Sequence, residues 1–205
     1  MKTEIYCDSA DLKTIRKLST NSLVSGFTTN PSLMRLAGAR DYKSYSLKLL
    51  KARKGKPISL EVFGDTPEQM LEQAKIINSW GQNVYVKIPV VNSRGFFSGK
   101  VINTLSKKRI KLNITAVYTV NQVKKIIKNI NKNSKTIISI FSGRMSDVGK
   151  DPIPIIKESI RLTKKKRNVK ILWASTREAY NYMPLLYLPK VSLFFSFYLL
   201  EGPSL

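Results

Sequence analysis

Residues 58–90, ISLEVFGDTPEQMLEQAKIINSWGQNVYVKIPV, contain one full repeat of the pattern that decides the fold. The runs 58–63 and 84–90 have the length and the β-branched content of buried strands, and a helical period over 66–80 separates them. A strand, a helix and a second strand in this order form a unit with parallel strands. The stretch therefore predicts an α/β protein.

The same alternation continues on both sides of this stretch. Further strands are predicted at 4–8, 23–29, 111–119, 136–143 and 169–176, and further helices at 10–19, 41–54, 98–109, 119–130 and 151–165. Seven such units in 205 residues favour a parallel (β/α)8 TIM barrel with an atypical or incomplete eighth βα unit. An open doubly wound sheet is the alternative.

Polar side chains recur where the predicted strands end. In a barrel all the carboxyl ends of the strands meet at one face, whereas an open sheet distributes them along a crevice. The recurrence therefore favours a barrel with its functional site at that face. The residues concerned are Asp8, Thr28, Thr29, Asn30, Glu61, Lys87, Asn113, Thr115, Ser139, Arg144, Ser175 and Arg177.

Lys87 stands in the middle of the apolar run 84–90. Burial penalises the ammonium form, so a lysine in such a strand must either find a partner or lose its proton. A neutral lysine can attack a ketone and form a Schiff base, with Glu61 and Asp8 as proton carriers. The alternative is that Lys87 forms a buried ion pair with Glu61 or Asp8.

Two arginines follow successive predicted strands, in FSGR (141–144) and ASTR (174–177). Arginine binds phosphate through two parallel hydrogen bonds, and small neighbours leave backbone amides free to assist. Each arginine alone is also compatible with a surface ion pair. Together they predict a phosphate-binding end of the site.

Composition limits the function classes. The hydrophobic content of 42% and the charged content of 24% predict one soluble domain, and the absence of histidine excludes Ser/His/Asp triads and the usual zinc sites. The single Cys7 excludes an intrachain disulfide and is expected to be a buried, inert thiol. The amino terminus shows no signal peptide, so we expect a cytoplasmic protein.

The formal charge of +23 is compatible with nucleic-acid binding. However, the basic residues are spread over predicted helix surfaces without interleaved aromatic residues, which favours no dedicated nucleic-acid partner. A positive field also attracts small phosphorylated substrates. We therefore expect the charge to serve solubility and substrate attraction.

The last segment differs from the rest. Residues 182–205 contain prolines and a dense apolar block without a helical period, so we divide the chain into a barrel at 1–181 and an atypical tail. The tail is compatible either with a final strand at 191–200 or with a divergent or frame-disrupted terminus. The block is too short for a membrane anchor, which needs about 18 apolar residues. An exposed apolar tail favours association or aggregation, and a barrel left inactive by this tail is one alternative for the whole protein.

Six of these segments together resemble the transaldolase family, close to its short subfamily that includes fructose-6-phosphate aldolases. They are GFTTNPSLM, SLEVFGD, VYVKIPV, LNITAVYT, ISIFSGRMSDVGKDP and ILWASTREAYN, in order between residues 4 and 181. The resemblance implies a class I aldolase barrel in which Lys87 forms the Schiff base and Asp8 carries the proton of the C4 hydroxyl. It implies that Glu61 and Thr115 hold the catalytic water. Asn30, Asn113 and Ser139 would hold the dihydroxyacetone portion, and Arg144, Ser175 and Arg177 the phosphate.

Two positions separate the activities within that family. Transfer enzymes resemble this chain in carrying Glu61 and Phe141, whereas the aldolases carry glutamine and tyrosine there. The resemblance thus implies a transaldolase that acts on sugar phosphates in the pentose phosphate pathway and needs no metal or organic cofactor. An aldolase that releases dihydroxyacetone is the alternative. A homo-oligomer is compatible with the resemblance, although the tail argues against it.

Overall fold

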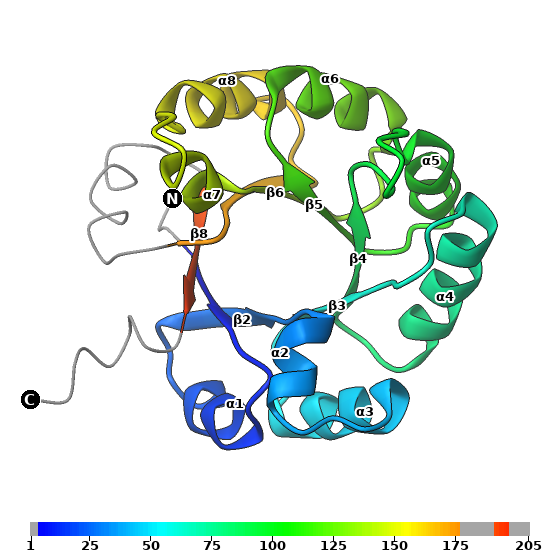
Figure 1. The fold of residues 1–205 in the computed structure, drawn as a ribbon, viewed down its shortest axis with the longest axis vertical. Helices are drawn as coiled ribbons and strands as arrows, with labels where there is room; N and C mark the ends of the chain where they lie inside the picture. Colours follow the sequence, from blue (N-terminus) through cyan, green and yellow to red (C-terminus); the bar gives the residue numbers. More distant parts are fainter. Residues whose placement is uncertain (1–3, 177–190, 197–205) are drawn as a thin grey trace, which may run out of the picture.

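The parallel strands predicted from the alternating pattern close on themselves. The structure is a computed structural model that describes residues 4–176 and 191–196. Its strands form a closed barrel in the order β1 to β8, surrounded by helices (Figure 1). The strands are β1 (Ile5–Asp8), β2 (Val24–Thr28), β3 (Ile58–Glu61), β4 (Val84–Pro89), β5 (Leu112–Val117), β6 (Thr136–Ile140), β7 (Val169–Trp173) and β8 (Val191–Ser196).

The helices follow the strands along the chain. Several begin at a side chain that accepts a hydrogen bond from the first helical turn, as Asp11, Asp41, Thr66 and Thr119 do. None of the helices in the described ranges is long and apolar enough to cross a membrane. The helices are α1 (Leu12–Ser19), α2 (Pro31–Leu36), α3 (Tyr42–Ala52), α4 (Pro67–Ser79), α5 (Gly99–Lys107), α6 (Val120–Asn129), α7 (Ser142–Ser146) and α8 (Ile153–Thr163).

The sequence prediction of a (β/α)8 barrel is confirmed, and the open sheet is wrong. Some element boundaries were also wrong. The strand predicted at 136–143 ends at Ile140, because Ser142 and Gly143 already belong to the short helix α7. The strand predicted at 111–119 ends at Val117, since Thr119 caps α6. Helix α2 was not predicted.

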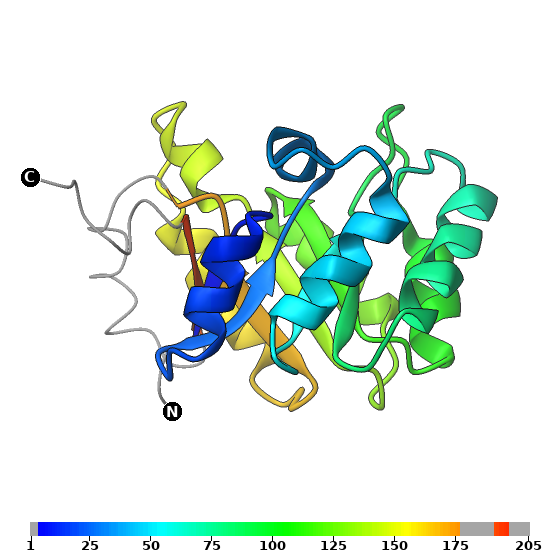
Figure 2. The same ribbon diagram turned by 90° about the horizontal axis from the view of Figure 1, so that it is seen from below.

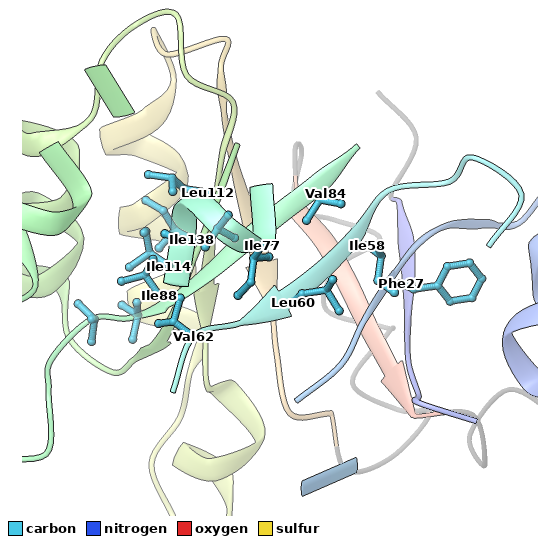
Figure 3. Close-up of a cluster of buried hydrophobic side chains, with 14 of the residues drawn as sticks. Phe27, Ile58, Leu60, Val62, Ile77, Val84, Ile88, Leu112, Ile114 and Ile138 are labelled. Carbon is cyan, nitrogen blue, oxygen red and sulfur yellow. The ribbon is translucent and has the colours of Figure 1, made fainter. Parts of the chain in front are cut away.

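Strand alternation divides the side chains between two cores. Residues of one parity, such as Leu60 and Ile88, point away from the barrel axis and are fully buried beneath the helices. Figure 3 shows this outer core on β2 to β6, together with Ile77 of α4. The opposite parity fills the barrel, where Tyr6, Tyr85, Ile137 and Leu172 form a separate buried cluster.

The two ends of the barrel differ in what covers them. Helices α2 and α7, which directly follow strands, lie beyond the carboxyl ends of the strands, at the top of Figure 2. The turn between α8 and β7, drawn in orange, lies at the opposite end. The carboxyl end is therefore the face where the predicted polar side chains meet.

Strand β8 closes the barrel. It pairs in parallel with β1, where Ser196 is opposite Asp8, and with β7, where Leu193 is opposite Trp173. This strand lies within the apolar segment 191–200. The other residues of 182–205 lie outside the described residues, and the division into 1–181 and 182–205 stays a prediction.

Candidate active site

A cavity of about 230 Å³ opens at the carboxyl end of the barrel. Nine of the residues predicted for the site line it, namely Asp8, Asn30, Lys87, Asn113, Thr115, Ser139, Phe141, Arg144 and Ser175. Glu61 contacts Lys87 from the neighbouring strand. Arg177 lies outside the described residues. The barrel thus gathers side chains from β1 to β7 that are far apart in the sequence.

Lys87 is held in the barrel wall between β3 and β5. The pairing register places it opposite Glu61 on one side and Asn113 on the other. The side chain is only 10% exposed, its Nζ lies 3.0 Å from Oε2 of Glu61, and Nζ also donates a 3.3 Å hydrogen bond to the carbonyl oxygen of Thr29. The ion pair that the sequence left open is therefore present, with Glu61 as the partner.

Glu61 ends β3 and is fixed from outside the barrel. The hydroxyl of Tyr42 donates a 2.8 Å hydrogen bond to the backbone carbonyl of Glu61. The ring of Tyr42 in turn packs edge-on against Phe63 at 4.4 Å between centroids. Helix α3 thus holds the backbone of Glu61, whose carboxylate faces Lys87.

Asp8 ends β1 beside the same amine. It is partly buried, and loss of hydration raises its pKa from 3.8 to about 7. The positive charge of Lys87 and a 3.1 Å hydrogen bond from Oγ1 of Thr28 oppose this rise, and Glu61 adds to it. A carboxyl group with a pKa near 7 can both give and take a proton at neutral pH.

A chain of side-chain hydrogen bonds orients the amide of Asn113. Oγ of Ser139 donates to Oδ1 of Asn113 at 2.7 Å, and Nδ2 of Asn113 donates to Oγ of Ser59 at 3.0 Å. All three residues are buried. Both ends of the amide therefore have partners within this wall of the barrel.

Thr115 lies on β5, within an irregular stretch of the strand. The register of β5 against β6 shifts between Ile114 and Val117, and Ala116 adopts a left-handed conformation with φ of 57°. The hydroxyl of Thr115 is buried and has no hydrogen-bond partner among the described residues. It lines the cavity, so it is a polar group available to a small molecule there.

The remaining predicted residues form the outer part of the cavity. Asn30 caps α2 through Oδ1, which accepts from the backbone N–H of Leu33. Arg144 is on α7, and Ser175 follows β7 with a left-handed φ of 62°. Phe141 stacks edge-on with Tyr118 at 5.7 Å between ring centroids.

Sequence reasoning missed several contributors to this site. Thr28 had been noted as a polar strand end but was not assigned to the site, although it donates to Asp8. Ser59 and Leu172 were missed. The alternation of side chains between the two faces of a strand could have identified them. Ser59 shares a face with Glu61, and Leu172 is opposite Ser139 in the β6–β7 register.

The chemistry available here is that of an amine and carboxyl groups. No group of three or more His, Cys, Asp or Glu side chains suited to a metal ion occurs in the part of the chain that the structure describes. A shielded lysine between strand-end polar groups can form a covalent adduct with a carbonyl compound. Asp8 and Glu61 lie where they can move protons for it.

Fold and site together define an α/β barrel with a shielded lysine amine and carboxyl groups inside the barrel mouth. The family model described as "Transaldolase/Fructose-6-phosphate aldolase" matches residues 5–191, and the chain belongs to this family. A "Probable transaldolase" of Streptococcus equi subsp. zooepidemicus is 37% identical over 155 residues, covering 76% of this chain and 68% of that protein. Another, of Streptococcus agalactiae, is 35% identical over 153 residues, covering 75% and 66%.

Solved structures support the fold alone. An orotidine 5'-monophosphate decarboxylase from Metallosphaera sedula matches with a TM-score of 0.58 at 13% identity, over 98% of this chain and 92% of that one. A putative phosphonomutase from Burkholderia cenocepacia matches with a TM-score of 0.61 at 10% identity, over 95% and 86%. Both agree with a TIM barrel and say nothing about the reaction of this chain.

Proposed function

We propose that this protein is a transaldolase that transfers a dihydroxyacetone unit from a ketose phosphate to an aldose phosphate. The observation that carries the proposal is the shielded Lys87 amine, 3.0 Å from Glu61, in a cavity also lined by Asp8. The family membership and the names of the relatives support it. Donors of the required chemistry are fructose 6-phosphate and sedoheptulose 7-phosphate.

The first stage forms a Schiff base on Lys87. Glu61 accepts a proton from the ammonium group, and the neutral amine attacks the C2 carbonyl of the ketose to give a carbinolamine. Loss of the C2 hydroxyl as water gives the iminium ion. The hydroxyl of Thr115, which has no partner among the described residues, and the carboxylate of Glu61 are suited to hold that water.

The second stage breaks and remakes a carbon-carbon bond. Asp8 removes the proton of the C4 hydroxyl, the C3–C4 bond breaks, and its electron pair enters the iminium group to form an enamine. The aldose phosphate leaves as an aldehyde. The enamine then attacks the aldehyde of the acceptor, and Asp8 returns its proton to the new hydroxyl. Addition of water to the resulting iminium ion releases the new ketose and restores the lysine amine. The iminium ion on Lys87 is the electron sink in this scheme, so no metal or organic cofactor is required.

Substrate binding divides along the cavity. Asn30, Asn113 and Ser139 lie on the wall near Lys87 and are suited to the hydroxyl groups of the dihydroxyacetone portion. Arg144 on α7 and Ser175 after β7 also line the cavity and are suited to the phosphate group, with Arg177 as a further proposed ligand. We propose a cytoplasmic role in the pentose phosphate pathway on the basis of these substrates.

Phe141 favours transfer over release. A tyrosine hydroxyl at this position would offer a proton donor for releasing the three-carbon unit as free dihydroxyacetone. Phenylalanine has no such group, so the enamine survives until an acceptor arrives. Phe141 lines the cavity, where a hydroxyl on its ring would be part of the site.

Borohydride reduction in the presence of fructose 6-phosphate tests the proposal. We expect one labelled peptide that contains Lys87, and no labelling in the Lys87→Met variant. Lys170→Met is the matched control, because Lys170 is also ion-paired, at 2.6 Å from Glu4, but lies at the other end of the barrel. Unchanged labelling after Lys87→Met would contradict the assignment.

Product analysis then separates the two activities of the family. With fructose 6-phosphate and erythrose 4-phosphate together, a transaldolase forms sedoheptulose 7-phosphate and little free dihydroxyacetone. Release of dihydroxyacetone at the same rate with and without the acceptor would instead identify an aldolase. Absence of labelling and of both products in folded protein would identify an inactive barrel.

A further inference from the structure

The positive charge gathers at the end of the barrel opposite the active site. The chain segments that lead from helices into strands lie there, at 20–23, 53–57, 80–83, 108–111, 130–135 and 164–168. Segments 53–57 and 108–111 contain three Lys or Arg residues each, 130–135 contains two and 164–168 contains four. None of the six segments contains Asp or Glu. Twelve of the 36 Lys and Arg residues of the chain, from four separate segments, therefore lie at this end of the barrel.

Some of these cations are used to hold the barrel together. Arg53, which is 6% exposed, donates to the backbone carbonyl groups of Lys56 and Gln82. Lys56 donates to carbonyl groups of 18, 21 and 24, and Lys111 donates to the side chain of Asn83. These contacts engage three of the six cations in segments 53–57 and 108–111.

The cations on the side of β6 and β7 surround a cavity instead. It has a volume of about 620 Å³ and lies between the segments 130–135 and 164–168, with Lys132, Lys135, Lys165, Arg167 and Lys170 in its lining. Lys170 is paired with Glu4 at 2.6 Å. The other four cations form no ion pair with a carboxylate in the described ranges.

The floor of this cavity also offers an unused donor. Tyr85 is 8% exposed and lines the cavity, and its hydroxyl makes no hydrogen bond to any described residue. The amide of Asn168, in contrast, is engaged with the carbonyl groups of Asn131 and Ser134, which ties the two segments together. The cavity therefore has linked segments as its frame, cations in its lining and a tyrosine beside them.

We propose that this cavity binds a small ligand that carries two or more phosphate groups. Four unpaired cations around one concavity match several negative charges better than a single phosphate group. The volume is within the range of about 300–1,000 Å³ typical of small-molecule sites. A membrane surface fits less well, because none of the exposed large hydrophobic residues among the described ones is in either segment.

Calorimetric titration with tripolyphosphate tests the proposal. We expect saturable binding that weakens as salt is added, and much weaker binding of inorganic phosphate. The double variant Lys135→Gln and Lys165→Gln should weaken tripolyphosphate binding by about tenfold, because it removes two of the four unpaired cations. Tyr85→Phe should weaken it by about threefold through loss of the hydroxyl donor.

The matched control changes net charge equally at another place. Lys43→Gln and Lys48→Gln remove two exposed lysines from α3 and should leave tripolyphosphate binding unchanged. Equal weakening in this control would overturn the proposal, since binding would then follow net charge alone. Tight binding of a single-stranded RNA that survives the double variant would also overturn it, in favour of a nucleic-acid surface. Borohydride labelling of Lys87 should be the same in all variants.

Discussion

Replacing Asp8 with asparagine should make the protein more stable at neutral pH while impairing its reaction. Burial raises the pKa of Asp8 from 3.8 to about 7, so the folded state disfavours the ionised carboxylate. At 1.36 kcal/mol per pH unit this amounts to about 4 kcal/mol, and water in the open cavity reduces it to between about 2 and 4 kcal/mol. The asparagine side chain is free of this cost.

The pH dependence of the stability difference shows whether the raised pKa of Asp8 causes it. Below pH 3.8 the carboxyl group is protonated in both the folded and the unfolded chain, so the variant and the wild type should differ little. As the pH rises toward 7 the unfolded chain ionises first, and the wild type loses stability relative to the variant. The advantage of Asp8→Asn should therefore grow between about pH 4 and pH 7 and then level off.

Urea denaturation at a series of pH values measures this difference. Asp41→Asn is the control, because Asp41 is an exposed helix cap whose pKa is lowered by hydrogen bonds from Ser44. Its contribution has the opposite sign: it is present above pH 3.8 and is lost as the pH falls through the lowered pKa. A stability difference for Asp8→Asn that stays constant with pH would refute the reasoning. In addition, Asp8→Asn should slow transfer by about 10²–10⁴-fold and retain Schiff-base labelling.

Three further substitutions test particular contacts. Phe141→Tyr should raise the release of free dihydroxyacetone at the expense of transfer, and an unchanged product ratio would remove the proposed role of that ring. Asn113→Ala leaves its two serine partners without their bonds and should lower the unfolding free energy by about 1–3 kcal/mol, measured with urea; a neutral effect would contradict the described hydrogen-bond chain. Gly26→Ala brings a Cβ within 2.7 Å of the Tyr6 ring and 2.9 Å of a backbone oxygen, and should cost about 1–3 kcal/mol in the same assay. Wild-type stability of this variant would mean that β2 can shift without strain.

The barrel was predictable because strand and helix periods differ strongly in this chain. The outer faces of the strands are apolar and are packed against helices, so the alternation of strand and helix patterns is clear from β1 to β7. Helix α7 was missed because ISIFSGR continues an apolar strand pattern without a proline or a capping bond at Phe141. Helix α2 is only six residues long and begins at an Asn-Pro pair, where a turn was equally compatible.

The sequence was sufficient to predict which residues line the site, but not which of them contact one another. Parallel strands bring their carboxyl ends together, so polar strand-end residues meet in any barrel of this type. Which acid pairs with Lys87 depends on the pairing register, and Glu61 is directly opposite Lys87 on the adjacent strand. No property of the sequence reports that register. The basic cavity at the other end was missed for a related reason, since its edges come from segments that are distant along the chain.

The closure of the barrel has a consequence for the order in which the protein matures. Strand β1, which carries Asp8, has β8 as one of its two neighbours, so an early and a late segment of the chain complete each other. While a ribosome is still making residues 191–196, the inner side of β1 has an open edge and water can reach the carboxyl group of Asp8. Because loss of hydration is the main cause of the raised pKa of Asp8, that pKa depends on β8 being in place beside β1.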